Sequence, residues 1–221
     1  MKADFWHSRW QENRIGFHID EVNPYLLANW SRLGVDAPAT VFIPLCGKSV
    51  DIVWFIKQGY RVEAVELSPI AIEALIKEQG LIAEHAIQGD WQVWTGEGFR
   101  IWCGDYFKLT SQQLSSIDAV YDRAALIALP EEMRLEYVSH MKRLVGVVPQ
   151  LLVTLSYEQA QMAGPPFSVE NREVSQLYGD DYQGVDTAVV TENVLVKNTR
   201  FAERGVSRLD ESVFVLQVPK K

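Results

Sequence analysis

The chain has 221 residues, of which 48% are hydrophobic and 23% are charged, so it is long enough and apolar enough to fold around a sizeable core. Its formal net charge is −8 and no run of Lys and Arg occurs, so we expect no nucleic-acid partner and no anionic lipid surface. No apolar run approaches membrane-spanning length, and we expect no membrane contact.

The first half of the chain alternates between helical and strand patterns. Helices are predicted from apolar spacing with helix-starting and helix-ending residues, and strands from short apolar runs. Ser68 is the predicted N-cap of one helix, with Pro69 at its first position and Gly80 after its end. In chain order the segments are a helix at 20–33, a strand at 40–46, a helix at 49–59, a strand at 60–67 and a helix at 68–80.

The second half continues this alternation and ends in two strands. The segments are a hairpin at 91–105 that turns at Gly-Glu-Gly, a strand at 117–123, a helix at 130–145, a strand at 150–157, a helix at 172–179, and strands at 188–198 and 211–218 joined by a loop that contains 201–208. Alternating strands and helices imply a mostly parallel sheet, and the last two strands are expected to pair antiparallel at one edge. We therefore expect a single doubly wound α/β domain over residues 1–221.

The stretch VFIPLCGKSVD contains Gly-Lys-Ser directly after an apolar run, but it is not a phosphate loop. That motif requires a glycine five positions before Gly47, where this sequence has Phe42. The dinucleotide pattern G-x-G-x-x-G also fails because Gly47 stands alone, which argues against an NAD-type oxidoreductase. Taken by itself, Gly47 is best interpreted as a residue that turns the chain.

Glu66 closes the second predicted strand and changes this interpretation. An acidic residue about 20 positions after the first loop, at the end of the second strand, accepts hydrogen bonds from ribose hydroxyls. A loop without a glycine-rich cradle, followed by this acid, favours a cofactor that has a ribose and no phosphate. S-adenosylmethionine fits this description. The alternative interpretation is that Glu66 is an ordinary surface glutamate.

Only two cysteines occur, Cys46 and Cys103, which suits a reducing compartment better than a disulfide scaffold. Both lie beside apolar strand ends and are predicted to be buried structural thiols. The first residues, MKADFWHSRW, lack the apolar core of a signal peptide. We expect a cytoplasmic protein, and a monomer.

Four stretches, in the same order, resemble bacterial thiopurine S-methyltransferases: WHSRWQENRIGFH, VFIPLCGKSVDIVWFIKQGYRVEAVELS, YDRAAL and LSYEQAQMAGPPF. The resemblance covers nearly the whole chain. It implies the class I methyltransferase (Rossmann-like) fold, a doubly wound sheet of seven strands with the last antiparallel, and an N-terminal helical lid within a cofactor-covering segment at 1–35. It also implies methyl transfer from S-adenosylmethionine to the sulfur of aromatic or heterocyclic thiols such as thiopurines, with selenium and tellurium compounds as further acceptors.

The resemblance implies roles for particular residues. The cofactor would contact Trp6, Trp10, Leu45, Gly47, Glu66, Asp105, Tyr106 and Arg123. The acceptor would contact Phe17, Arg123, Pro166 and Arg204, and the catalytic residues Arg123 and Asp122 would position the reacting groups without a covalent nucleophile. Asp105 and Ala163 depart from what some relatives would have at these positions, which leaves fine substrate preference open.

The chemistry of methyl transfer sets few further requirements. The four histidines show no H-x-x-x-H spacing and the cysteines no C-x-x-C spacing, so no metal site is predicted. Arg123, at the end of a predicted strand, can stabilise a thiolate, although a structural Asp122–Arg123 pair is the rival interpretation. No convincing general base is present, and we hypothesise that an aromatic thiol, whose S–H is already acidic, needs none.

Two other functions stay open at this stage. One is an S-adenosylmethionine-dependent methyltransferase that acts on another small-molecule acceptor. The other is a noncatalytic module that binds an adenosine ligand, which would need Glu66 but neither paired cations nor an aromatic cover. We also expect the first 18 or so residues to be a lid, and the most mobile part of the chain without ligand.

Overall fold

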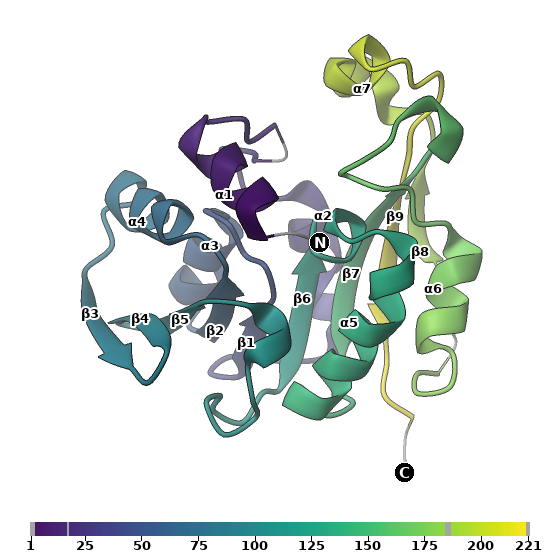
Figure 1. Cartoon of the computed structure of the whole chain (residues 1–221). Helices are drawn as coiled ribbons and strands as arrows, with labels where there is room; N and C mark the ends of the chain where they lie inside the picture. Colours follow the sequence, from purple (N-terminus) through teal and green to yellow (C-terminus); the bar gives the residue numbers. More distant parts are fainter. Residues whose placement is uncertain (1–2, 17, 184–186, 220–221) are drawn as a thin grey trace.

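The computed structural model describes residues 3–16, 18–183 and 187–219 (Figure 1). Strands within these residues form one sheet, in the order β3-β4-β5-β2-β1-β6-β7-β9-β8. The strands are β1 (Thr40–Ile43), β2 (Arg61–Glu66), β3 (Ala83–Gln88), β4 (Trp91–Gly96), β5 (Phe99–Cys103), β6 (Ala119–Arg123), β7 (Gln150–Ser156), β8 (Thr187–Thr191) and β9 (Asp210–Leu216).

The helices agree with most of the predicted segments. They are α1 (Ala3–Gln11), α2 (Pro24–Asn29), α3 (Asp51–Lys57), α4 (Pro69–Glu78), α5 (Glu131–Val145), α6 (Asn171–Tyr178) and α7 (Thr199–Glu203). Short 3₁₀ turns are η1 (Trp30–Leu33), η2 (Tyr106–Lys108), η3 (Leu126–Ala128), η4 (Gln159–Gln161) and η5 (Val194–Lys197). No helix in the described part of the chain has the length and apolar character needed to cross a membrane.

The sheet has a parallel centre and antiparallel edges. Strands β5, β2, β1, β6 and β7 run parallel to one another, whereas β9 lies antiparallel between β7 and β8. The doubly wound α/β sheet and its antiparallel last strand are thus confirmed. The described residues contain nine strands rather than the seven expected, because β3 and β4 extend the sheet beyond β5.

Strand β3 is absent from the sequence-based prediction. It pairs with β4 through a two-residue turn, because Gln88 faces Trp91 and only Gly89 and Asp90 lie between them. Gly89 has a φ of 61°, which suits a hairpin turn. The strand was missed because Ala, Glu, His and Gln have weak strand preference, and its exposed side chains leave no apolar alternation.

Two local predictions near helix and strand ends are wrong, and one is confirmed in position only. The strand expected at 188–198 stops at Thr191, because Asn193 adopts a left-handed φ of 48° and turns the chain into η5. The loop expected at 201–208 begins inside α7. Ser68 occupies the N-cap position of α4, but its buried hydroxyl makes no capping bond and has no hydrogen-bond partner among the described residues.

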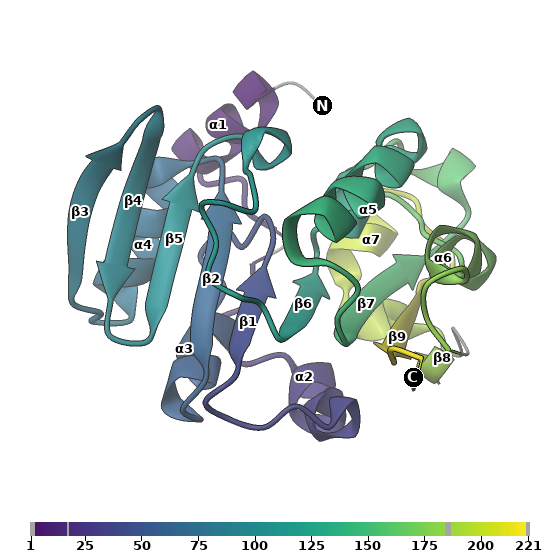
Figure 2. The ribbon, with the colours of Figure 1, turned by 90° about the horizontal axis from the view of Figure 1, so that it is seen from below.

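Helices cover both faces of the sheet, and each face has its own apolar core (Figure 2). Because side chains alternate along a strand, Phe42 packs with α5 and α6 on one face, whereas Val41 packs with α2, α3 and α4 on the other. The same alternation places Leu152 and Leu151 in opposite cores. The central strands are therefore buried on both sides, which holds their ends in fixed positions.

Candidate active site

A cavity of about 680 Å³ lies where the parallel strands end. Residues at or just beyond the carboxyl ends of β1, β2, β5, β6 and β7 line it, and α1 and α7 lie at the same end of the molecule (Figure 1). Open α/β sheets bind their ligands at this edge. The volume is within the range of sites for cofactors and small ligands.

Glu66 lines this cavity with 6% of its surface exposed. Its Oε2 accepts a hydrogen bond from the N–H of Gly47 and its Oε1 accepts one from the N–H of Ser68, both at 2.8 Å. Burial raises the pKa of Glu66, and the bonds from Ser68 and Gly47 partly oppose this rise. Each carboxylate oxygen can accept two bonds, so Glu66 joins two loops and still offers acceptor sites to a ligand.

Trp10 packs against Gly47 and closes one side of the cavity. Gly47 has a φ of 55°, and a Cβ added there would lie 3.2 Å from Cζ2 of the Trp10 indole. Trp10 is buried, and Trp6, one helical turn earlier on α1, also lines the cavity. Both tryptophans therefore share the cavity face of α1, as their i, i+4 spacing predicts.

Two residues at the ends of adjacent strands have unusual backbone angles. Leu45, after β1, has a φ of 46°, and Ala124, after β6, has a φ of 67°. The left-handed region costs a residue with a Cβ about 1–2 kcal/mol. Both residues line the cavity, so the strain coincides with the ligand site, where such strain is typically found.

Asp105 and Tyr106 line the cavity beyond the end of β5. The carboxylate of Asp105 accepts a hydrogen bond from the N–H of Phe107 at 3.0 Å, which stabilises the η2 turn. The hydroxyl of Tyr106 donates to the carbonyl of Tyr137 at 3.1 Å. Tyr106 is buried, and burial raises the pKa of its hydroxyl.

Arg123 lines the cavity, whereas its neighbour Asp122 is fully buried behind the lining. The Asp122 carboxylate accepts hydrogen bonds from the Tyr137 hydroxyl at 2.7 Å and from the Leu126 N–H at 3.2 Å. Burial raises the pKa of Asp122 to about 6, against the effect of these bonds. Asp122 therefore anchors the η3 turn, whose residue Ile127 lines the cavity, and its own side chain is not part of the lining.

A proline-containing loop after β7 forms an apolar wall of the cavity. The carbonyl of Pro166 accepts a hydrogen bond from the Tyr157 hydroxyl at 2.7 Å, and that of Pro165 accepts one from Arg204 at 3.2 Å. Both prolines and Arg204 line the cavity. Arg204 and Pro166, two of the expected acceptor residues, therefore line the same cavity. Phe17, the other expected acceptor residue, lies outside the described residues.

Sequence reasoning missed several residues of the lining. Arg9, Arg14 and Arg200 all contribute to it. Arg200 and Arg204 are four residues apart, a helical spacing that was not used because the segment was interpreted as a loop. Arg200 donates to the carbonyl of Gly16, 184 residues earlier in the chain, and no sequence signal connects these two residues.

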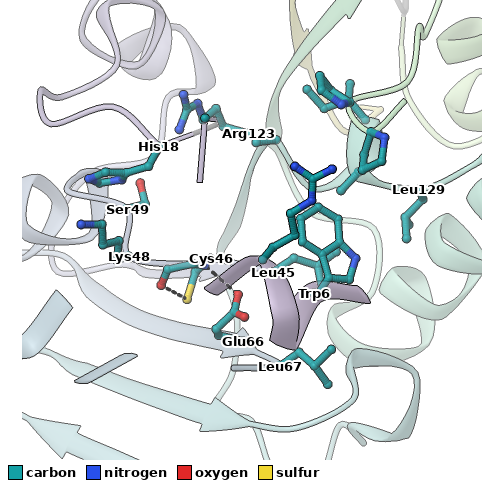
Figure 3. Close-up of a pocket in the computed structure, with 18 of the residues that line it drawn as sticks. Trp6, His18, Leu45, Cys46, Lys48, Ser49, Glu66, Leu67, Arg123 and Leu129 are labelled. Atoms are coloured by element: carbon teal, nitrogen blue, oxygen red, sulfur yellow. Dashed lines mark hydrogen bonds between the residues drawn. The ribbon is translucent and has the colours of Figure 1, made fainter. Parts of the chain in front are cut away.

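His18 also lines the cavity, and in the view of Figure 3 it lies beside Lys48 and Ser49. Its Nε2 is 2.9 Å from an Asp20 carboxylate oxygen. Burial lowers the pKa of His18, and the charge of Lys48 lowers it further. Lys48 in turn contacts both carboxylate oxygens of Glu78 at 2.8 Å, which ties the loop after β1 to α4.

The two cysteines are buried free thiols, as predicted. Burial raises the pKa of Cys46, which lines the cavity, and raises that of Cys103 to about 12. Both thiols therefore stay protonated near neutral pH and are poor nucleophiles. Across the described ranges, no three His, Cys, Asp or Glu side chains gather in a group that could hold a metal ion.

Comparison with known protein families shows which family the chain belongs to. The family model described as Thiopurine S-methyltransferase (TPMT) matches residues 1–219. The chain belongs to the thiopurine S-methyltransferase family. Within this family, it is 44% identical over 218 residues to the thiopurine S-methyltransferase of Nitrosospira multiformis, with 98% of each chain covered. It is 45% identical over 219 residues to that of Pseudomonas fluorescens (strain SBW25), with 98% of this chain and 99% of that one covered.

Solved structures show how this family member is folded. The 1,6-didemethyltoxoflavin-N1-methyltransferase of Burkholderia thailandensis, solved with S-adenosylhomocysteine, has a TM-score of 0.59 at 14% identity and covers 97% of this chain and 87% of its own. An S-adenosylmethionine-dependent methyltransferase from Anabaena variabilis has a TM-score of 0.61 at 13% identity, with 97% and 95% covered. At such identities the likeness concerns the fold, and the class I methyltransferase fold of this thiopurine S-methyltransferase family member is confirmed.

Proposed function

We propose that this chain transfers the methyl group of S-adenosylmethionine to the sulfur of aromatic or heterocyclic thiols, thiopurines among them. The observation that carries the proposal is the cavity in which Glu66, hydrogen-bonded to Gly47, lies beneath the tryptophans of α1. Membership of the thiopurine S-methyltransferase family over the whole chain supports the same reaction.

The lining suits S-adenosylmethionine on its own geometry. The Glu66 carboxylate retains acceptor capacity toward the cavity after bonding two backbone N–H groups, as a ribose diol requires. The absence of a side chain at Gly47 lets Trp10 come close to the strand end. We propose that the cofactor contacts Trp6, Trp10, Leu45, Gly47, Glu66, Asp105, Tyr106 and Arg123, and the acceptor contacts Phe17, Arg123, Pro166 and Arg204.

When bound, S-adenosylmethionine would supply a methyl group for in-line transfer: the bond from the acceptor's sulfur to the methyl carbon forms as the bond to the sulfonium breaks, and neutral S-adenosylhomocysteine is the leaving group. Trp6 and Trp10 exclude water and present aromatic faces, which attract a cation by about 0.5–2 kcal/mol. Arg123 stabilises the thiolate before transfer. The wall at Pro166 is held by Tyr157 and holds the ring in line, since alignment supplies much of the rate of such reactions.

No protein base is required in this mechanism. Asp122 lies behind the lining and accepts hydrogen bonds from Tyr137 and Leu126, so it positions the η3 turn instead of accepting the thiol proton. An aromatic thiol ionises near neutral pH by itself. A pH–rate profile that stays flat above the thiol's own pKa supports this mechanism, and an additional ionisation that disappears in Asp122→Asn contradicts it.

We further propose that the protein is a cytoplasmic monomer and that it acts as one methyltransferase domain with residues 1–35 as its cofactor-covering segment. The two free, buried cysteines support a reducing compartment. Selenium and tellurium compounds are additional acceptors under this proposal, because a soft anion suits the same displacement.

The test is transfer of radiolabelled methyl from S-adenosylmethionine to a thiopurine. The expected result is a methylated thioether with the wild-type protein and little product with Glu66→Ala. Cofactor binding without transfer to any aromatic thiol or chalcogen acceptor would instead indicate a noncatalytic binding module.

A further inference from the structure

The η2 turn after β5 is held from behind the cavity by a histidine of α5. His140 is buried, with 8% of its surface exposed, and it is not among the described residues that line the cavity. Its Nε2 lies 2.9 Å from the carbonyl oxygen of Tyr106, and its Nδ1 lies 3.1 Å from a guanidinium nitrogen of Arg143. The proposed methyl transfer gives this histidine no role.

The two contacts of His140 determine which ring nitrogen carries the hydrogen. A carbonyl oxygen only accepts, so Nε2 carries a hydrogen and donates it to Tyr106. A guanidinium only donates, so Nδ1 carries no hydrogen and accepts from Arg143. The geometry therefore fits the neutral imidazole. The imidazolium, which has a hydrogen on both nitrogens, could keep the first contact but not the second.

Ring contacts add to the hold of α5 on η2. The His140 ring meets the Tyr106 ring edge to face, with 5.0 Å between the centroids, and its centroid lies 6.0 Å from that of the Phe107 ring. The Tyr106 hydroxyl donates to the carbonyl of Tyr137, which also belongs to α5. Helix α5 thus holds the main chain of the turn through His140 and a side chain of the turn through Tyr137.

The η2 turn lies next to the place expected for the ribose of the cofactor. Strand β5 is the parallel neighbour of β2, and Cys103 is in register with Glu66. The chain that leaves β5 therefore passes beside Glu66, and Asp105, Tyr106 and Phe107 line the cavity there. A nucleoside whose ribose is held by Glu66 would meet this turn with its base.

We propose that neutral His140 is a positioning residue that fixes η2 where it receives the adenine base of S-adenosylmethionine, and that protonation of His140 releases the turn. This inference rests on the proposed function, because it takes the nucleoside of that cofactor as the ligand. A proton on Nδ1 would place two like charges, those of His140 and Arg143, side by side in a buried position, which is unfavourable.

The surroundings of His140 agree with a neutral ring. Burial lowers the pKa of His140, the bond to the Tyr106 carbonyl opposes this effect, and the charge of Arg143 lowers the pKa further. Glu136, one turn earlier on α5, raises the pKa, but its effect is smaller than these. The Tyr106 hydroxyl is engaged by Tyr137. Because the pKa lies below its ordinary value of 6.5, the hold on η2 is present above pH about 6.5 and is lost as pH falls further.

The first experiment measures the affinity for S-adenosylhomocysteine by calorimetry at several pH values between about 5 and about 8. His140→Ala should bind about three- to tenfold more weakly than wild type at pH about 8, as for one lost hydrogen bond. Wild-type affinity should fall by a similar factor toward pH about 5. Glutamine can donate to the Tyr106 carbonyl and does not titrate, so His140→Gln should bind as wild type at pH about 8 and lack this part of the fall.

The comparison between proteins isolates His140 from other groups that titrate. Glu66 and Asp122 are present in every variant, so their contribution to the pH dependence is common to all of them. The matched control is His85→Gln on the exposed strand β3, which should keep the wild-type pH dependence. If His140→Gln shows the full wild-type fall, or His140→Ala binds as wild type at pH about 8, the proposal is refuted while cofactor binding stands. If the wild type does not bind S-adenosylhomocysteine, the proposed function fails as well.

A second arm tests the turn without any ligand. The N–H groups of Lys108 and Leu109 bond within η2, to the carbonyls of Asp105 and Tyr106. Their hydrogen exchange in the free protein, corrected for the intrinsic effect of pH, should be faster in His140→Ala than in wild type and unchanged in His140→Gln. Equal protection in all three proteins would overturn the proposal.

A third arm tests whether the effect concerns the base. Methylthioadenosine lacks the amino-acid part of the cofactor and should lose affinity in His140→Ala by the same factor as S-adenosylhomocysteine. In steady-state kinetics the KM for S-adenosylmethionine should rise by that factor, whereas the KM for the thiopurine should not change. A loss confined to S-adenosylhomocysteine, or an equal rise of both KM values, would contradict a role at the adenine base.

Discussion

At the scale of single residues, the carboxylate of Glu66 combines a structural and a binding role. It holds the N–H groups of Gly47 and Ser68, which belong to the loops after β1 and β2. Burial raises the pKa of Glu66, which means that the environment disfavours its charged form. The site nevertheless keeps this acidic group at the place where a ribose is expected. Asp122 is similarly buried, and its oxygens accept hydrogen bonds from the Leu126 N–H of the neighbouring turn and from the Tyr137 hydroxyl.

Replacement of Glu66 should weaken cofactor binding. A hydrogen bond to a charged group contributes about 1.5–3 kcal/mol, so Glu66→Ala should lower affinity for S-adenosylhomocysteine by about tenfold or more. Calorimetry measures the affinity, and urea unfolding shows how much of the loss comes from the broken bonds to Gly47 and Ser68. Glu84→Gln on the exposed strand β3 is the matched control. Undiminished binding by Glu66→Ala would remove the basis of the cofactor assignment.

Asp122 should make stability depend on pH. Its pKa rises from 3.8 to about 6 on folding, so the folded state binds the proton more tightly than the unfolded state. The stabilisation of the folded state by this proton is fully present below pH about 4 and is lost as pH rises through about 6. Relative to Asp122→Asn, the wild-type free energy of unfolding should therefore fall by about 2 kcal/mol between pH about 4.5 and about 7.5. Urea unfolding of both proteins at the two pH values measures this difference. A difference that does not change with pH would contradict the shift.

At the scale of elements, the N-terminal segment is held at one end by polar contacts and rests on the cavity at the other. The Asn23 N–H donates to the buried carboxylate of Asp51 at 2.8 Å, and Asp51 also accepts from the Tyr121 hydroxyl at 2.9 Å. Nearer the amino end, the Trp10 ring lies against Gly47. The Asn23–Asp51 contact thus marks the place beyond which the segment is fixed to the sheet.

Bound cofactor should protect α1 and the residues after it from protease. Trypsin cuts after Arg9 and Arg14, which line the cavity, and S-adenosylhomocysteine should slow both cuts severalfold if the segment closes over the ligand. Arg32, which lies beyond the Asn23 anchor, is the internal control and should be cut at an unchanged rate. Mass spectrometry of timed digests measures the three sites. Equal rates at Arg9 and Arg14 with and without ligand would exclude a lid.

At the scale of the whole molecule, one sheet serves as the shared wall of two apolar cores. Adjacent residues of β7 belong to different cores, since Leu151 packs with α2 and α3 and Leu152 packs with α5 and α6. The two cores cannot unfold separately without exposing one face of the sheet. The strand ends that line the cavity are therefore held by both cores.

Leu151→Ala and Leu152→Ala should each destabilise the whole molecule. Both side chains are fully buried, and each substitution should lower the free energy of unfolding by about 2–5 kcal/mol. Each variant should retain a single urea transition that coincides by far-UV circular dichroism and tryptophan fluorescence. Two separate transitions in either variant would show that the cores unfold independently.

The sequence by itself determined the order and type of most elements, because apolar periodicity and residues such as Pro69 at helix starts act locally. It also determined the family. It identified Glu66 as the candidate ribose ligand, since the end of a strand and the loop that follows it are adjacent in the chain. Strand β3 and helix α7 were missed because polar, exposed side chains leave little periodic signal.

Only the tertiary structure decided which side chains meet around the cavity. Arg200 contacts Gly16, 184 residues away, and Asp122 is placed behind the lining although its neighbour Arg123 is in it. Local sequence cannot encode either result, because both depend on packing between segments far apart in the chain. The convergence of arginines on one cavity in an acidic protein is a property of that packing alone.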